Sequence, residues 1–112
     1  MIPLRGDVYQ VKFDPTEGNE IKKSRSAIII SNDAINRAAN VVIVCPITAS
    51  LGKGSPIHIQ IPVGEAGLTK ESVAHCGQIR AVDKSRLGAK FGALSPATME
   101  QVNEGIRNTL RV

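Results

Sequence analysis

Two unbroken aliphatic runs constrain the fold of this chain more than any other feature. They are residues 27–30 (Ala-Ile-Ile-Ile) and residues 41–44 (Val-Val-Ile-Val). β-Branched residues favour strands, and a run without polar alternation is typical of a strand that is buried on both faces. We therefore expect a strand at each run, and we expect the first to be buried on both sides.

Shorter segments with a two-residue period predict the remaining strands. Tyr9, Val11 and Phe13 alternate with polar residues, and residues 57–61 alternate between two prolines, which favours an edge strand. Residues 73–76 and 78–82 predict two further segments, with a break at Gly77 where a bulge is one option.

Helix signals occur at two places. Residues 31–33 (Ser-Asn-Asp) form a capping sequence for a short helix that ends near residue 39. Ser95 and Pro96 form an N-cap and first turn, and apolar residues follow at helical spacing through residue 110. The fold class we expect is mostly β with a C-terminal α-helix, in the form of a small antiparallel β-barrel. Residues 1–112 are expected to make a single domain.

Composition narrows the function classes. The formal net charge is +4, and the basic residues are spread over both halves of the chain, which favours a polyanionic partner such as RNA or DNA. No apolar run is long enough for a membrane span or a signal peptide, so we expect a cytoplasmic protein. The two cysteines, Cys45 and Cys76, are far apart in sequence and predict buried thiols rather than a zinc site or a disulfide.

Two polar residues lie close to the aliphatic runs. Arg25 precedes the first run and Thr48 follows the second. If the two strands pair in one sheet, a fixed cation and a fixed hydroxyl would line one edge of a cleft. That combination suits a phosphodiester better than a peptide or a sugar, because guanidinium matches phosphate oxygens and stays charged.

The order of several sequence blocks resembles the MazF/PemK family of toxin endoribonucleases over nearly the whole chain. The blocks that carry the resemblance are Arg5-Gly6-Asp7-Val8-Tyr9, Asp14-Pro15 with Gly18 and Glu20, Arg25, Ser31-Asn32-Asp33 with Asn36, Pro46-Ile47-Thr48, Gln78-Ile79-Arg80, Asp83, Arg86-Leu87 and Leu94-Ser95. Each block alone is weak, whereas their ordered sum is specific.

The resemblance implies a β-barrel toxin of the CcdB/PemK type that forms a homodimer. It also implies cleavage of single-stranded RNA at short sequences without metal or cofactor, 2′,3′-cyclic phosphate ends, and inhibition by a cognate antitoxin. Arg25 and Thr48 are the implied catalytic residues. The chemistry agrees, because the attacking 2′-hydroxyl creates a dianionic phosphorane that a fixed cation can stabilise.

Further residues are candidates for contact with RNA. His75 could supply a phosphate contact or a proton, since imidazole titrates near neutrality, whereas His58 is expected at the surface. The RNA-binding candidates are Lys22, Lys23, Ser24, Lys53, Gln78, Arg80, Lys84 and Arg86. For Arg80 the alternative is a structural pair with Asp83, and for Lys84 and Arg86 it is a solvated loop.

Two departures from the family pattern keep other functions open. Members often have proline after the arginine and an acid before the glutamine, whereas this chain has Ser26 and Gly77. A catalytic scheme that relies on that acid cannot operate here. The alternatives are a toxin of the same fold that acts on DNA gyrase and an RNA-binding module whose active site has decayed. The expected antitoxin is a partly disordered acidic peptide that orders on contact.

Overall fold

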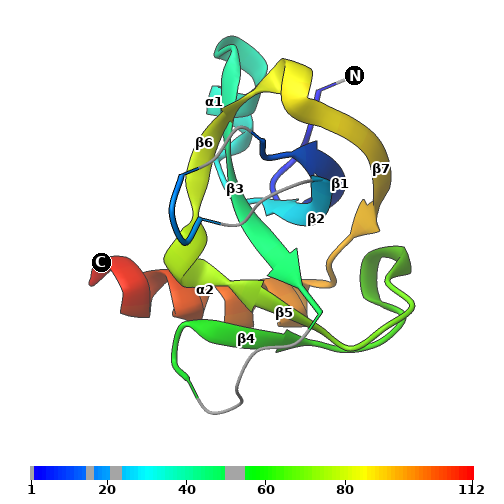
Figure 1. The fold of residues 1–112 in the computed structure, drawn as a ribbon, viewed down its shortest axis with the longest axis vertical. Coiled ribbons are helices and arrows are strands. Elements are labelled where there is room, and N and C mark those ends of the chain that lie inside the picture. The colour runs from blue at the N-terminus through cyan, green and yellow to red at the C-terminus, as the bar shows by residue number, and fades with distance from the viewer. Residues whose placement is uncertain (1, 15–16, 21–23, 50–54) are drawn as a thin grey trace.

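A seven-stranded antiparallel sheet carries most of the chain, and one long helix lies across it (Figure 1). The computed structural model describes residues 2–14, 17–20, 24–49 and 55–112. The strands are β1 (Asp7–Lys12), β2 (Ser24–Ile29), β3 (Val41–Thr48), β4 (His58–Ile61), β5 (Ser72–His75), β6 (Arg80–Asp83) and β7 (Leu87–Ala93). The helices are α1 (Asp33–Ala38) and α2 (Pro96–Leu110), with 3₁₀ turns η1 (Glu65–Gly67), η2 (Cys76–Gln78) and η3 (Lys84–Arg86).

The strand order is β4-β5-β3-β2-β1-β7, and β6 also pairs with β3. Strand β3 therefore pairs with β6 along its first half and with β5 at its end, and η2 joins these two partners. The expected antiparallel β fold with a C-terminal helix is confirmed. The sheet curls without closing, because no pairing joins β4 to β7 within the described residues, so an open curled sheet replaces the expected barrel.

Strand β2 is buried on both faces, as its sequence predicts. Ala27 and Ile29 pack with Val42 and Val44 in one hydrophobic cluster, which we call the inner core. Ile28 faces the other way and packs in a second cluster, the helix-side core, which is covered by α2. Since successive side chains of a strand point to opposite faces, this single strand separates the two cores.

Strand β3 is longer than its aliphatic run suggests. The strand continues through Pro46, which is fully buried, and ends at Thr48 rather than turning to solvent at the proline. Its first half is also less buried than its composition implies, because Val41 and Ile43 are 42% and 37% exposed. Both belong to the helix-side face, so α2 covers only the end of β3 that carries Cys45.

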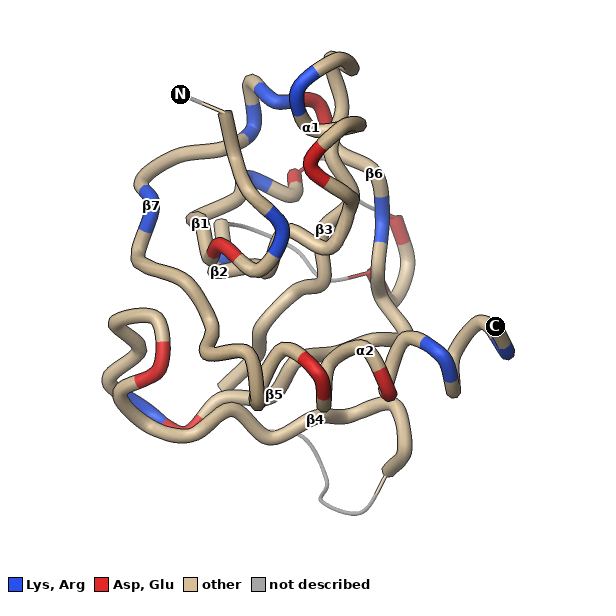
Figure 2. The backbone as a smooth tube through the Cα atoms, turned by 180° about the vertical axis from the view of Figure 1, so that it is seen from behind, with Lys and Arg blue, Asp and Glu red and all other residues tan. Residues whose placement is uncertain are grey.

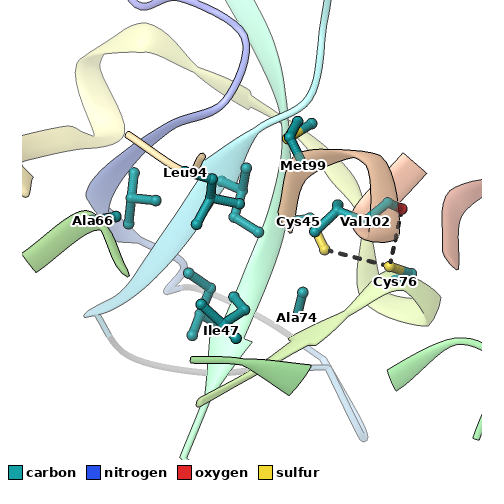
Figure 3. Packing of buried hydrophobic residues seen from close by; sticks show 11 residues of the cluster. Cys45, Ile47, Ala66, Ala74, Cys76, Leu94, Met99 and Val102 are labelled. Carbon is teal, nitrogen blue, oxygen red and sulfur yellow. Dashed lines mark hydrogen bonds between the residues drawn. The ribbon is translucent and has the colours of Figure 1, made fainter. Parts of the chain in front are cut away.

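Helix α2 is seated on the sheet through a glycine. A Cβ atom at Gly105 would lie 2.7 Å from Cys76 Sγ and 2.8 Å from Ile59 Cγ1, so only glycine permits this approach. Figure 3 shows Cys45 and Cys76 beneath the helix, beside Val102. The two sulfur atoms are 3.9 Å apart and both residues are fully buried free cysteines, which confirms the expected thiols.

The capping predictions for both helices are confirmed. The Asn32 side chain accepts from the Ile35 N–H at the start of α1, and Ser95 Oγ accepts from the Thr98 N–H at the start of α2. Helix α2 has an additional anchor at this end, since the Glu65 carboxylate accepts from the Ser95 N–H and from the hydroxyls of Ser95 and Thr98, at 2.8 Å each.

We expect the Glu65→Ala variant to lose about 1.5 kcal/mol of unfolding free energy at pH 7, because these bonds end on a charged acceptor. The bonds from Ser95, and next that from Thr98, hold the pKa of Glu65 below its ordinary value of 4.5. A carboxyl pKa that is lower in the native state than in the unfolded state stabilises the fold at every pH above the unfolded-state pKa. That stability is lost as the pH falls through the native-state pKa. Urea unfolding between pH 7 and pH 3 should show the two proteins converging in acid.

The matched control for this prediction is Glu104→Ala. Glu104 lies on α2 and its carboxylate accepts only from Arg107 among the described residues, in an exposed ion pair. Exposed pairs contribute little to stability. An equal loss of stability in both variants would contradict the role given to Glu65.

Strand β7 was not predicted from the sequence. It contains Gly88 and Gly92, lacks a two-residue period, and is largely exposed. Pairing with β1 forms the strand, in a register that brings Val8 opposite Gly92. Gly92 is also needed for packing, since a Cβ there would lie 2.9 Å from Ala66 Cα in η1.

The charged residues are spread over most elements rather than grouped in one terminal run (Figure 2). Within the described part of the chain, no helix has the length and apolar character that crossing a bilayer requires.

Candidate active site

Four buried polar atoms have no hydrogen-bond partner among the described residues. They are Thr48 Oγ1, His58 Nδ1, His75 Nδ1 and Arg80 Nη1. Buried polar groups in folded proteins are nearly always paired, so each exception calls for an explanation such as a functional role. We call these four residues the unpaired cluster.

Strand register places all four residues on the face of the sheet that carries the inner core. Arg80 lies opposite Val44, a member of the inner core. Thr48 lies four positions after Val44 on β3 and therefore shares its face. Thr48 is opposite Val73, His75 follows two positions later on β5, and His58 is opposite His75. Side chains directly opposite in antiparallel strands share a face, as do those two positions apart.

Arg25 lies on the same face of the sheet, on strand β2, whereas His75 and His58 lie on β5 and β4. Ala27 is opposite Pro46 in the pairing of β2 with β3. Arg25 precedes Ala27 by two residues and Thr48 follows Pro46 by two residues, so both side chains belong to the face of this pair. Arg25 is exposed and lies opposite Val11 in the pairing with β1. The expectation that the two aliphatic strands pair in one sheet is confirmed, and Arg25 and Thr48 line one hollow at the ends of these strands.

The two histidines form a close pair. Their ring centroids are 4.6 Å apart and the ring planes meet at 78°, an edge-to-face contact. Burial, and next the neighbouring His58, lower the pKa of His75. A lowered pKa favours the neutral form of the His75 imidazole. His58 is half-buried in this contact, so the expectation that it is a surface residue is wrong, because the edge strand turns that side chain toward β5.

Arg80 packs on an aromatic ring and makes no ion pair with Asp83 among the described residues. Its guanidinium carbon lies 5.7 Å from the ring centroid of Phe13, within the range of a cation–π contact. The Asp83 carboxylate instead accepts a hydrogen bond from the Ser85 N–H and caps η3. This hydrogen bond is the largest cause of the lowered pKa of Asp83. The expected structural pair is therefore not formed.

A hollow of about 280 Å³ reaches Arg25 and Thr48 at the ends of their strands. A second hollow of about 300 Å³ also includes Arg25. The first is lined by Ser24, Arg25, Ser26, Ile47, Thr48, Ala49, Leu68, Thr69, Lys70, Glu71 and Ser72. The second is lined by Gln10, Ser24, Arg25, Ser26, Gly67, Leu68, Thr69 and Phe91. The five residues they share make the two hollows parts of one depression.

The other residues predicted to contact RNA are divided by the structure. Ser24 lines both hollows, whereas Gln78 Nε2 donates to the Asn19 carbonyl at 3.5 Å. Arg86 Nη1 donates to the carbonyls of Lys12 and Asp14 and so fixes the end of β1. The side chain of Lys84 lies half-buried beside Tyr9 in a separate hollow. Lys22, Lys23 and Lys53 lie outside the described residues.

Several residues of the site were missed in the sequence. Gln10 and Phe91 are far from the aliphatic runs, and Thr69, Lys70 and Glu71 come from a segment without periodicity. No local pattern could have identified them, because only the fold brings β7 and this segment beside β2. For His58, the alternation of residues 57–61 predicts the strand, but only the pairing of β4 with β5 places its side chain opposite His75.

Comparisons with known proteins agree with this geometry. The family model described as "PemK-like, MazF-like toxin of type II toxin-antitoxin system" matches residues 4–110. Endoribonuclease MazF of Staphylococcus saprophyticus is 40% identical over 103 residues, which cover 91% of this chain and 86% of the relative. Endoribonuclease EndoA of Bacillus subtilis is 37% identical over 111 residues, which cover 98% and 96%.

A solved structure shows the same fold. An endoribonuclease from a mycobacterial species, solved in complex with its cognate antitoxin, superposes with a TM-score of 0.81. The sequences are 24% identical, and the match covers 98% of this chain and 96% of the other.

Proposed function

The chain belongs to the family of PemK-like, MazF-like toxins of type II toxin–antitoxin systems, and from this membership we propose that it is a sequence-specific endoribonuclease toxin. Its substrate is single-stranded RNA, it needs no metal, and a cognate antitoxin inhibits it. The names of the relatives support RNA cleavage rather than action on DNA gyrase.

One observation carries the proposal. The buried side-chain atoms without partners in the described chain all lie on one face of the sheet, and Arg25 lies on the same face. A hydroxyl, a guanidinium nitrogen and one nitrogen of each of two imidazoles, all without hydrogen-bond partners among the described residues, match the needs of a phosphodiester, whose oxygens accept hydrogen bonds and whose cleavage moves protons. An active site that has decayed into a plain binding surface would not need these groups to stay unpaired.

We assign each group a role from its chemical type and its face of the sheet. The 2′-oxygen attacks the adjacent phosphorus, the bond to the 5′-oxygen breaks, and a 2′,3′-cyclic phosphate remains. Arg25 stabilises the charge that develops on the phosphorane, and the Thr48 hydroxyl orients a phosphate oxygen. Neutral His75 accepts the proton of the 2′-hydroxyl, the leaving 5′-oxygen takes a proton from water, and the hydroxide that remains takes the proton back from the His75 imidazolium. Arg80 supplies a second cationic donor to the phosphate.

Gly77 fits this assignment of the base to His75. A Cβ atom at Gly77 would lie 3.0 Å from Ile57 Cδ1 and 3.2 Å from His75 Cε1. A side chain at this position would therefore crowd the imidazole. The absence of an acid at position 77 leaves His75 room within the unpaired cluster and leaves the proton transfer to it.

Exposed apolar residues and the net charge indicate which proteins this chain binds. Val41 and Ile43 are exposed, and Ala81, opposite Ile43, is also exposed. This apolar strip on β3 and β6 is suited to a second copy of the chain, so the toxin acts as a homodimer. The net charge of +4 favours an acidic antitoxin segment as well as RNA.

The proposal is tested by incubating purified protein with a long single-stranded RNA in EDTA. We expect discrete fragments with 2′,3′-cyclic phosphate ends, identified by mass spectrometry. Thr48→Ala should slow cleavage by roughly 10²-fold, since it removes one oriented donor from the transition state. Thr109→Ala, whose hydroxyl donates to a carbonyl within α2, is the matched control and should cut at the wild-type rate. RNA left intact by wild-type protein would refute the nuclease assignment.

A further inference from the structure

The depression beside Arg25 extends from Thr48 to the face of β2 that Ser24 and Ser26 occupy. Ser24 and Ser26 alternate with Arg25 and therefore face the depression, and Gln10 is opposite Ser26 in the pairing of β1 with β2. Arg25 lines both hollows, and Thr48 lines one of them. The depression is thus continuous with the proposed cleavage site around the end of the strands.

The far wall of the depression is fixed by close backbone packing. Gly67 has a φ of +74°, and a Cβ there would lie 2.9 Å from the Phe91 carbonyl oxygen, so turn η1 contacts β7 without side chains between them. Glu65, in the same turn, is anchored to the start of α2 by its three hydrogen bonds. Leu68 is tied back as well, because its carbonyl accepts from the Gly64 N–H at 2.8 Å. This wall therefore keeps its shape without a ligand.

The lining combines an exposed aromatic ring with short polar side chains. Phe91 is 45% exposed although it is one of two phenylalanines in the chain, and the other is fully buried. Gln10, Ser24, Ser26 and Thr69 surround it with donors and acceptors. An aromatic face with polar groups at its edge is the pattern by which proteins bind an unpaired nucleobase, through stacking and hydrogen bonds to the base edge.

We propose that this depression is a nucleotide subsite, in which Phe91 stacks on the base next to the scissile phosphate and Gln10, Ser24 and Ser26 read its edge. The inference rests on the proposed endoribonuclease function and specifies where part of its sequence selectivity resides. An RNA strand that places its phosphate at Arg25 and Thr48 reaches the depression with the adjoining nucleotide, because these residues line both places. Lys70, on the rim, is available to the following phosphate.

The test uses a pool of single-stranded RNAs that carry a randomised segment, cut by wild-type protein and by Phe91→Leu and Phe91→Tyr, with sequencing of the products. Phe91→Leu keeps apolar bulk but removes the π face. We expect it to lower kcat/KM by roughly 10-fold to 100-fold, in the range of losing one stacked base, and to weaken base preference at one position beside the cut. Phe91→Tyr should cut like wild type. Gln10→Ala should change which base is preferred at that same position.

The control is Leu110→Ala, which alters an exposed apolar residue on α2 and should leave rate and preference unchanged. If wild-type protein cuts at a defined sequence and Phe91→Leu and Gln10→Ala keep the same rate and preference, the subsite is wrong while the nuclease function stands. If wild-type protein does not cut the pool, the proposed function itself fails. A loss of antitoxin inhibition with unchanged RNA cleavage would assign the depression to the antitoxin and overturn the subsite.

Discussion

Replacing Arg25 by alanine is expected to lower kcat/KM for RNA cleavage by roughly 10³-fold, the largest functional effect that this structure predicts. Arg25 lines both hollows and shares one of them with Thr48. Its guanidinium offers a planar fork of donors to the charge that develops on the phosphorane. The measurement is the cleavage rate of a fluorescent RNA oligonucleotide that contains one site found with wild-type protein.

Two variants show whether the loss comes from position or from charge alone. Arg25→Lys keeps the charge but not the fork, so its rate should lie between those of wild type and Arg25→Ala. Arg37→Ala removes the same charge from an exposed position in the last turn of α1 and should weaken cleavage only slightly, by an amount that disappears in high salt. Equal losses in Arg25→Ala and Arg37→Ala would show that Arg25 acts only through net charge.

Replacing Phe13 by alanine is expected to cost about 3–5 kcal/mol of unfolding free energy, the largest stability effect. Phe13 is fully buried in the inner core, and its ring also supports the guanidinium of Arg80. Removing it leaves a cavity and withdraws the cation–π contact. Small domains have only about 5–15 kcal/mol in total, so the variant should unfold at much lower urea concentration and at lower temperature.

Phe91→Ala provides the matched comparison, since the same side chain is removed from an exposed position. Its unfolding free energy should fall by less than about 1 kcal/mol, as is usual for surface substitutions. Equal destabilisation of the two variants would contradict the assignment of Phe13 to the core and of Phe91 to an open surface.

The predictions that held were local ones. Unbroken aliphatic runs gave β2 and β3, and alternation gave β1 and β4. The caps at Asn32 and Ser95 marked the starts of both helices. Strand β7 gave no such signal, because Gly92 is required by backbone contact with η1 and the strand conformation depends on pairing with β1.

Some residues of the candidate site could be selected from the sequence, and others could not. Arg25 and Thr48 could be selected from the sequence, because their types suit a phosphate and the ordered blocks placed them in a known family. Arg86 is also a basic residue in one of the ordered blocks, yet its side chain donates to two backbone carbonyls at the end of β1. A basic residue in a sequence does not reveal whether its donors are already used.

The sequence by itself determined the elements and the family, because both depend on the types and spacing of neighbouring residues. Tertiary structure decided which polar atoms remain without partners among the described residues, which hydroxyl shares a hollow with which cation, and where Phe91 lies relative to Arg25. These facts depend on strand register and on the close approach of segments far apart in the chain. Register is fixed by the burial of both faces of β2, since a shift of one residue would exchange its two cores.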